Sequence, residues 1–262
     1  MTYIDWTEIK APDFAAIGRD AVALVPVGAT EQHGPHLPMG TDSILAQAIA
    51  VAAAKLSQAN VYVLPPQTVG KSDEHLDFPG TLTLDAQTLT AVLLQLGRSV
   101  ARAGFRRIVF LNAHGGNVPV LQIVARALRV ELGMFAVTAG WMSMGYPEGL
   151  VSAAEARDGI HGGFVETAAM LHLRPDLVDM TKAANFVPRS RIVAETNQVL
   201  RLVGMVGAGW MASDLNPEGV AGDAAAADAS TGKAIIDHAV ARYAIMLDEV
   251  AAMSIAHLGA IP

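Results

Sequence analysis

Four short apolar runs alternate along this chain with longer segments that are rich in alanine and leucine. The runs have the length and the β-branched content of buried strands, whereas the longer segments have the length of helices. A strand, a helix and a second strand in that order form the parallel βαβ unit. The alternation therefore predicts an α/β fold with a mostly parallel sheet.

The predicted elements follow one another in a regular order. The expected strands are Ala21–Gly28, Asn60–Pro65, Arg107–Asn112 and Met134–Gly140. The expected helices run over about Asp42–Ser57, Asp85–Ala103, Asn117–Leu132, Gly163–Leu173 and Ser230–His257. The segment Thr181–Gly222 has two prolines, many polar residues and no clear period, so we expect a surface excursion there. No repeat or low-complexity linker divides the chain, and we expect a single domain over residues 1–262.

Composition narrows the classes of protein to which the chain can belong. Hydrophobic residues make up 52% of the chain and charged residues only 16%, so a large core is available and burial in a homo-oligomer is favoured. The formal net charge of −7 argues against a nucleic-acid partner. We see no signal peptide and no membrane span, and we expect a cytoplasmic protein. Because the chain has no cysteine, any metal ion must be held by His, Asp and Glu.

The first reactive segment follows the first expected strand. Glu31-Gln32-His33 and then Asp42 place two carboxylates and an imidazole within twelve residues. In extended backbone Glu31 and His33 point to the same side. A mixture of oxygen and imidazole donors suits Zn²⁺, Mn²⁺ or Fe²⁺ better than Ca²⁺. The alternative is that Asp42 only caps a helix while Glu31 and His33 lie exposed in a loop; the three together favour a metal site.

The second reactive segment is His114-Gly115-Gly116-Asn117, which follows the apolar end of the third expected strand. Two glycines allow a tight turn from strand to helix. One alternative is a turn histidine without further role, and another is a phosphate loop at a helix N-terminus. The phosphate loop is disfavoured because neither Gly-x-Gly-x-x-Gly nor a Lys-Ser/Thr pair follows. We interpret His114 as a candidate metal ligand.

The third reactive segment contains His161 and Glu166, which are five residues apart. On one helix this spacing would separate them by roughly 140°. We therefore expect His161 in the turn before the helix and Glu166 in its first turn, both facing a pocket. The alternative is a glycine-rich cap in which Glu166 only complements the helix dipole.

Other polar residues carry weaker signals. The loop Ser72–Thr81 is dense in polar groups and, taken alone, indicates solvated surface. His172, His238 and His257 lie within expected helices, and we expect them to be structural.

The three reactive segments and the loop Ser72–Thr81 occur in an order that resembles the creatininase (creatinine amidohydrolase) family. The resemblance extends from about residue 20 to residue 175, and Gly219–Asp223 is similar to the late glycine-rich segment of that family. It implies a three-layer α/β/α sandwich with a mostly parallel central sheet. It also implies a two-metal centre and a homo-oligomer, commonly a hexamer.

The resemblance also implies the metal ligands. Glu31, Asp42 and His114 would hold one divalent ion, and His33 and the bridging Asp42 would hold the other with one further acid. In creatininase that acid lies two residues after the matching histidine, where this chain has a glycine, so Glu166 is the replacement. The expected ions are Zn²⁺ or Mn²⁺, with Fe²⁺ as an alternative.

By the same resemblance, His161 would shuttle a proton and Ser72 would contact the substrate. We also expect Glu74 or His75 to orient the substrate from the same loop. The tryptophan that creatininase closes over its substrate, just before the histidine that matches His161, is missing here.

These assignments predict a dinuclear metal-dependent amidohydrolase. A metal-activated water would open a cyclic or linear amide C–N bond, other than an ordinary peptide bond, in a small molecule or peptide. One alternative is a non-enzymatic binder of small anions, which the acidic residues Glu31, Asp42 and Glu74 disfavour. Another is an isomerase or lyase that uses the same ligands.

Overall fold

The computed structural model describes residues 2–204 and 206–255. Its main sheet has five strands in the order β1-β3-β2-β4-β5, and every neighbouring pair is parallel. The strands are β1 (Thr2–Asp5), β2 (Val22–Val27), β3 (Asn60–Val63), β4 (Arg107–Asn112) and β5 (Phe135–Gly140). The prediction of a mostly parallel sheet is confirmed.

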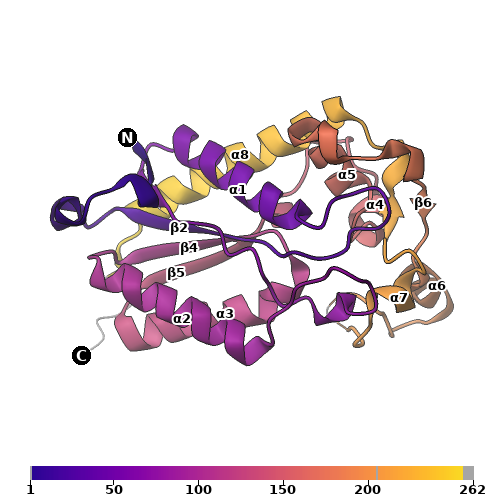
Figure 1. The fold of residues 1–262 in the computed structure, drawn as a ribbon, viewed down its shortest axis with the longest axis horizontal. Coiled ribbons are helices and arrows are strands. Elements are labelled where there is room, and N and C mark those ends of the chain that lie inside the picture. Colours follow the sequence, from indigo (N-terminus) through magenta and orange to yellow (C-terminus); the bar gives the residue numbers. More distant parts are fainter. Residues whose placement is uncertain (1, 205, 256–262) are drawn as a thin grey trace.

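Helices cover both faces of this sheet (Figure 1). One face carries α1 (Thr41–Leu56), α5 (Phe164–Leu173) and α8 (Ala229–Ala252), and the other carries α2 (Ala86–Arg102) and α3 (Val118–Leu132). Alternate side chains of β2 point to opposite faces: Val22 and Leu24 join the core under α1 and α8, whereas Val25 joins the core under α2 and α3. The three-layer α/β/α sandwich is therefore confirmed.

The central elements lie close to where the sequence predicts them. The four expected strands and five expected helices are all present, and most of their ends shift by one or two residues. The expected helix Ser230–His257 instead ends at Ala252, and His257 lies outside the described residues. Strand β1 was not predicted, because its four residues include only one β-branched aliphatic side chain, Ile4.

The rest of the chain forms short elements. The expected excursion Thr181–Gly222 contains β6 (Asn185–Phe186), α6 (Arg189–Thr196) and α7 (Ala212–Leu215). Strand β6 pairs antiparallel with β7 (Gly222–Asp223), and α4 (Ala153–Asp158) contacts β7. The short 3₁₀ helices are Trp6–Glu8, Ala11–Ala16, Asp73–His75, Gly115–Asn117, Trp141–Met144, Pro175–Leu177, Met180–Lys182 and Ala224–Ala226. None of the described helices is long and apolar enough to cross a membrane.

Asn117 fastens together three loops at the carboxyl end of the sheet. Its amide nitrogen donates to the carbonyl oxygen of Gly28, which follows β2, and to the side-chain oxygen of Asn112, which ends β4. Its amide oxygen accepts from the backbone N–H of Lys71, in the loop after β3. The side chain is fully buried, so no water is available to replace these partners.

We therefore predict that Asn117→Ala lowers the free energy of unfolding by about 2–4 kcal/mol, because buried backbone groups lose their partners. Chemical denaturation of the two proteins measures this difference. As a control, Asn197→Ala changes an exposed side chain, and we expect an effect within about 0.5 kcal/mol. An equally small effect of Asn117→Ala would contradict the role of Asn117 as a fastener.

Candidate metal centre

The five predicted metal ligands meet at the carboxyl end of the sheet. Glu31 and His33 come from the loop after β2, Asp42 from the first turn of α1, His114 from the end of β4 and Glu166 from the first turn of α5. All five are buried, with exposed fractions between 0% and 5%. Segments that are far apart in the sequence thus converge at one water-excluded point.

Asp42 lies between two groups of donor atoms. Its Oδ1 lies 3.1 Å from Nε2 of His33, and its Oδ2 lies 3.4 Å from Nδ1 of His114. Glu31 Oε1 lies 3.1 Å from the same nitrogen of His114, and Glu166 Oε2 lies 3.9 Å from Nε2 of His33. Asp42 thus contacts His114, which Glu31 also contacts, and His33, which lies near Glu166. Donor atoms of Glu31, His33 and Asp42 lie within 4.8 Å of one another, as do those of His33, His161 and Glu166.

Backbone carbonyl groups orient both histidine rings. His33 Nδ1 lies 3.1 Å from the carbonyl oxygen of Glu31, and His114 Nε2 lies 2.8 Å from that of Lys71. A carbonyl oxygen only accepts hydrogen bonds, so these nitrogens carry the protons. The opposite nitrogen of each ring then faces Asp42. This is the arrangement by which proteins commonly aim a histidine at a metal ion.

Three carboxylate oxygens of this cluster lack hydrogen-bond donors. Both oxygens of Glu31 and Oδ2 of Asp42 are buried without a hydrogen-bond partner. Leaving carboxylate oxygens unpaired in a dry interior is costly unless a cation balances them. A hollow of about 190 Å³ beside the cluster is lined by Asp42, His114, His161 and Glu166 among others. The donor set and this space fit divalent cations.

The same charges shift the pKa values of the ligands. Burial lowers the pKa of His33, but Asp42, Glu166 and Glu31 together outweigh it and raise that pKa to about 10. Burial raises the pKa of Asp42, yet His33 and His114 hold it below its usual range. Burial, with the nearby Asp42, raises the pKa of Glu166 to about 7, although His33 opposes this. Without metal ions, protons on the histidines balance the carboxylates.

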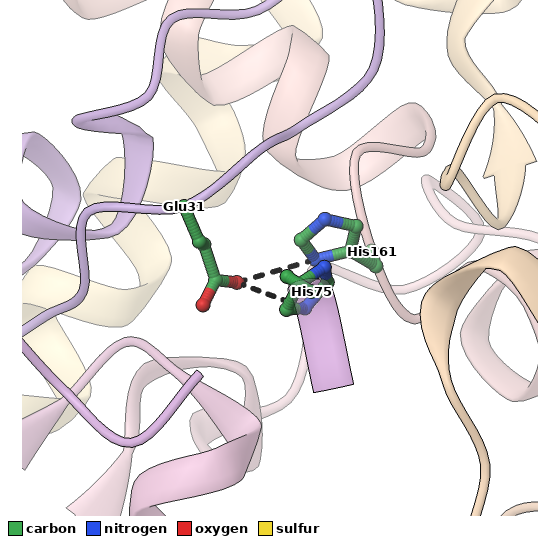
Figure 2. A group of neighbouring side chains, drawn as sticks. All are labelled: Glu31, His75 and His161. Carbon is green, nitrogen blue, oxygen red and sulfur yellow. Dashed lines mark ion pairs between the residues drawn. The ribbon is translucent and has the colours of Figure 1, made fainter. Parts of the chain in front are cut away.

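Two further histidines lie near the Glu31 oxygen that His114 contacts. Nε2 of His75 lies 3.3 Å and Nδ1 of His161 lies 3.7 Å from Oε1 of Glu31 (Figure 2). Burial lowers the pKa of His75 to about 4 and the pKa of His161 well below its ordinary value, so both rings are neutral. As predicted from the sequence, His161 precedes the helix and Glu166 lies in its first turn.

The predicted substrate loop divides into two parts. Ser72 is fully buried, and its Oγ lies 3.4 Å from Nε2 of His114. Glu74 and His75 instead line a cavity of about 600 Å³ that also reaches His114 and His161. Oε1 of Glu74 lies 3.5 Å from Nε2 of His114. The substrate roles of Ser72, Glu74 and His75 remain predictions.

The far wall of this cavity comes from the expected surface excursion. Val203, Trp210 and Met211 line it, opposite Pro119 and Ile160. These residues were not predicted, because nothing in the local sequence shows which part of an irregular segment folds back onto a site. The available signal was an isolated tryptophan in a glycine-rich stretch.

The backbone around Gly116 leaves no room for a side chain. A Cβ atom there would lie 2.2 Å from the carbonyl oxygen of Lys71, 2.4 Å from Nε2 of His114 and 2.5 Å from Oε1 of Glu74. An acidic ligand at position 116 is therefore excluded in this backbone. Glu166 faces His33 instead, at the distance given above.

Comparison with known proteins agrees with the resemblance noted in the sequence. Residues 5–247 match the model of the family described as creatinine amidohydrolase. A mycofactocin precursor peptide peptidase from Mycobacterium ulcerans is 37% identical over 234 residues, which cover 84% of each chain. A creatinine amidohydrolase from Pseudomonas putida is 34% identical over 205 residues, which cover 71% of this chain and 75% of that protein. The solved structure named "Creatininase Mn" has a TM-score of 0.75 and 26% identity, covering 95% of this chain and 98% of its own.

We predict that the metal-free protein loses stability as the pH rises from about 7 to 10. The folded state raises the pKa of His33 from 6.5 to about 10, so the resulting stability is full below pH 6.5 and is lost as the pH rises through 10. Chemical denaturation of chelator-treated protein at several pH values measures this. His33→Asn should reduce the dependence, and His114, whose pKa is also raised, should account for what remains. His172→Asn, in α5, should leave the dependence unchanged. A stability that rises over this range contradicts the prediction.

We predict that Gly116→Ala weakens divalent metal binding by about tenfold or more, because the new Cβ displaces His114 or the carbonyl group of Lys71. Titration of metal-free protein with Zn²⁺ measures the affinity. Gly115→Ala is the matched control, since no atom lies within 4 Å of its added Cβ. Equal affinities of the two variants would show that the packing around Gly116 does not matter for the site.

Proposed function

The chain belongs to the creatininase (creatinine amidohydrolase) family and is a metal-dependent amide hydrolase, and on this premise we propose that two divalent cations share Asp42. One observation carries the proposal. The two oxygens of Asp42 face different histidines, and each histidine has a second carboxylate beside it.

We assign one cation to Glu31, Asp42 and His114, and the other to His33, Asp42 and Glu166. Solved creatininases named as a manganese form and as a Zn–Zn form support Mn²⁺ or Zn²⁺ as the ions. Imidazole nitrogens and carboxylate oxygens suit both. When bound, such cations lower the pKa of a water molecule and polarise an amide carbonyl group.

The neutral histidines beside the cations handle protons. His161 and His75 both line the 600 Å³ cavity and lie against Glu31, so substrate and ligands meet at these rings. A neutral histidine can accept a proton from water and deliver it to the leaving nitrogen of the amide. We assign this transfer to His161, in agreement with the family resemblance.

The size and lining of the cavity indicate the class of substrate. A volume of about 600 Å³ is typical of sites for drug-sized ligands or short peptide segments. Trp210 and Met211 supply an apolar wall, whereas Lys71 and Glu74 supply charges near the cations. We propose an amide that carries an apolar group, as a peptide or substituted small molecule does. Relatives named as a precursor peptide peptidase and as a creatinine amidohydrolase support this range.

The oligomeric state and the cellular location of the protein remain predictions. Exposed apolar side chains on the excursion support the predicted homo-oligomer: Val187, Ile192, Val199, Leu200 and Val206. The hexamer and the cytoplasmic location are predictions from the sequence. An anion binder is disfavoured, because buried carboxylates without hydrogen-bond donors would repel an anion.

We predict that Asp42→Ala removes both cations and lowers amide hydrolysis by about a thousandfold or more, because this side chain serves both sites. Metal analysis of protein purified without added metal, and assays on cyclic and linear amides, measure the two effects. Asp237→Ala, which changes an exposed carboxylate on α8, is the control. Full metal content and turnover in Asp42→Ala would disprove the shared ligand.

A further inference from the structure

We propose that Gln32 is a positioning residue that gives His75 and His161 opposite hydrogen-bonding roles at the cavity. His75 presents an N–H group from Nε2, and His161 presents a lone pair on Nδ1. The catalytic meaning of this arrangement rests on the proposed function, whereas the arrangement itself rests on the hydrogen bonds described below.

The orientation of the Gln32 amide is fixed by two backbone partners. The N–H of Gly34 donates to Oε1 of Gln32 at 2.8 Å, and Nε2 of Gln32 donates to the carbonyl oxygen of Gly219 at 2.8 Å. Exchanging the amide oxygen and nitrogen would set donor against donor and acceptor against acceptor. Only 5% of Gln32 is exposed, so solvent does not relieve such a mismatch.

His161 donates to the main chain of Gln32. Its Nε2 lies 2.7 Å from the carbonyl oxygen of Gln32, which can only accept, so this nitrogen carries the proton. Oε1 of Glu31, which Nδ1 faces, lies 3.7 Å away and accepts no hydrogen bond, so Nδ1 keeps its lone pair. The short distance between Nε2 of His161 and the Gln32 amide nitrogen, 3.2 Å, is then a contact of two donors and not a hydrogen bond.

The second amide hydrogen of Gln32 consequently goes to His75. Nε2 of Gln32 lies 2.8 Å from Nδ1 of His75, which must accept. In a neutral ring the proton is then on Nε2, which lies 3.3 Å from Oε1 of Glu31 but outside hydrogen-bond geometry. A dashed line in Figure 2 joins this nitrogen to Glu31, but its N–H group makes no hydrogen bond there and remains available to a substrate oxygen in the cavity that His75 lines.

The position of the His75 proton distinguishes the cluster of Glu31, His75 and His161 from the metal ligands around Asp42. Glu31, His75 and His161 offer three atoms close enough together to hold a metal ion. However, a proton on Nε2 of His75 blocks coordination there unless the bond from Gln32 is broken. His75 and His161 therefore form a face that handles protons, beside the two groups of ligands that share Asp42, to one of which Glu31 belongs.

The two histidine rings are placed to act on the two groups that gain protons or negative charge in amide hydrolysis, the carbonyl oxygen and the leaving nitrogen. The ring centroids of His75 and His161 lie 4.3 Å apart. Nε2–H of His75 can donate to the carbonyl oxygen as negative charge develops on it. The water oxygen bonds to the carbonyl carbon. One of the water protons passes through Nδ1 of His161 to the leaving nitrogen as the C–N bond breaks. The other proton remains with the carboxylic acid product.

The late glycine-rich segment gains a role from the same arrangement. Gly219 has φ +69°, and a Cβ there would lie 2.6 Å from Nε2 of Gln32. Two residues later, the N–H of Ala221 donates to the carbonyl oxygen of His161 at 2.8 Å. The segment thus contacts both Gln32 and His161 and fixes their positions relative to each other.

The test is ¹⁵N NMR of histidine-labelled, metal-free protein at neutral pH, which distinguishes Nδ1–H from Nε2–H rings. In the wild-type protein we expect both His75 and His161 as neutral Nε2–H rings. In Gln32→Met we expect His75 to lose its single tautomer while His161 keeps its own, because the main-chain carbonyl group remains. The control Gln47→Met, in α1, should leave both unchanged. A wild-type His75 with the proton on Nδ1, or a His75 unaffected in Gln32→Met, overturns the proposal.

Metal-loaded enzyme provides the second readout. Gln32→Met should keep its metal content and a KM within about twofold of wild type, while kcat falls by about tenfold or more. Loss of the metal ions would instead overturn the proposal, because Gln32 would then be supporting ligands. If the wild-type protein shows the expected tautomers but hydrolyses no amide, the proposed function fails and the positioning role of Gln32 stands.

Discussion

Burial of the Asp42 carboxylate between His33 and His114 is the interaction on which the rest of the site depends. In the described part of the chain, Glu31, Asp42 and Glu166 form ion pairs with histidines alone. Three carboxylates buried away from water are stable only if positive charge, from cations or from protonated histidines, balances their negative charge. The centre is therefore suited to binding metal, and in the metal-free protein the histidine protons supply the positive charge.

The parallel sheet makes this concentration of charge achievable. Strands β2 and β4 are neighbours, and their last residues, Val27 and Asn112, are paired in register. Their loops therefore emerge side by side, and Asn117 ties both to the loop after β3. The fold brings the ligand-bearing loops together, and backbone carbonyl groups orient the rings of His33 and His114.

Much of this could be predicted from the sequence, and the exceptions have a common cause. The apolar runs and the spacing of Glu31, His33 and Asp42 are local signals, so the sheet and the candidate ligands could be proposed before any coordinates. The roles of Gln32, Asn117 and Trp210 depend on partners that are 40 or more residues away in the chain. No local pattern encodes such partners, and the short strand β1 likewise depends on pairing with β3.

The most direct test of the central claim is anomalous X-ray diffraction from crystals of the protein loaded with Zn²⁺ or Mn²⁺. The account predicts two anomalous peaks per chain, one on each side of the Asp42 carboxylate, with His114 at one and His33 at the other. A single peak, or peaks that do not touch Asp42, would contradict the claim that one buried carboxylate holds two cations.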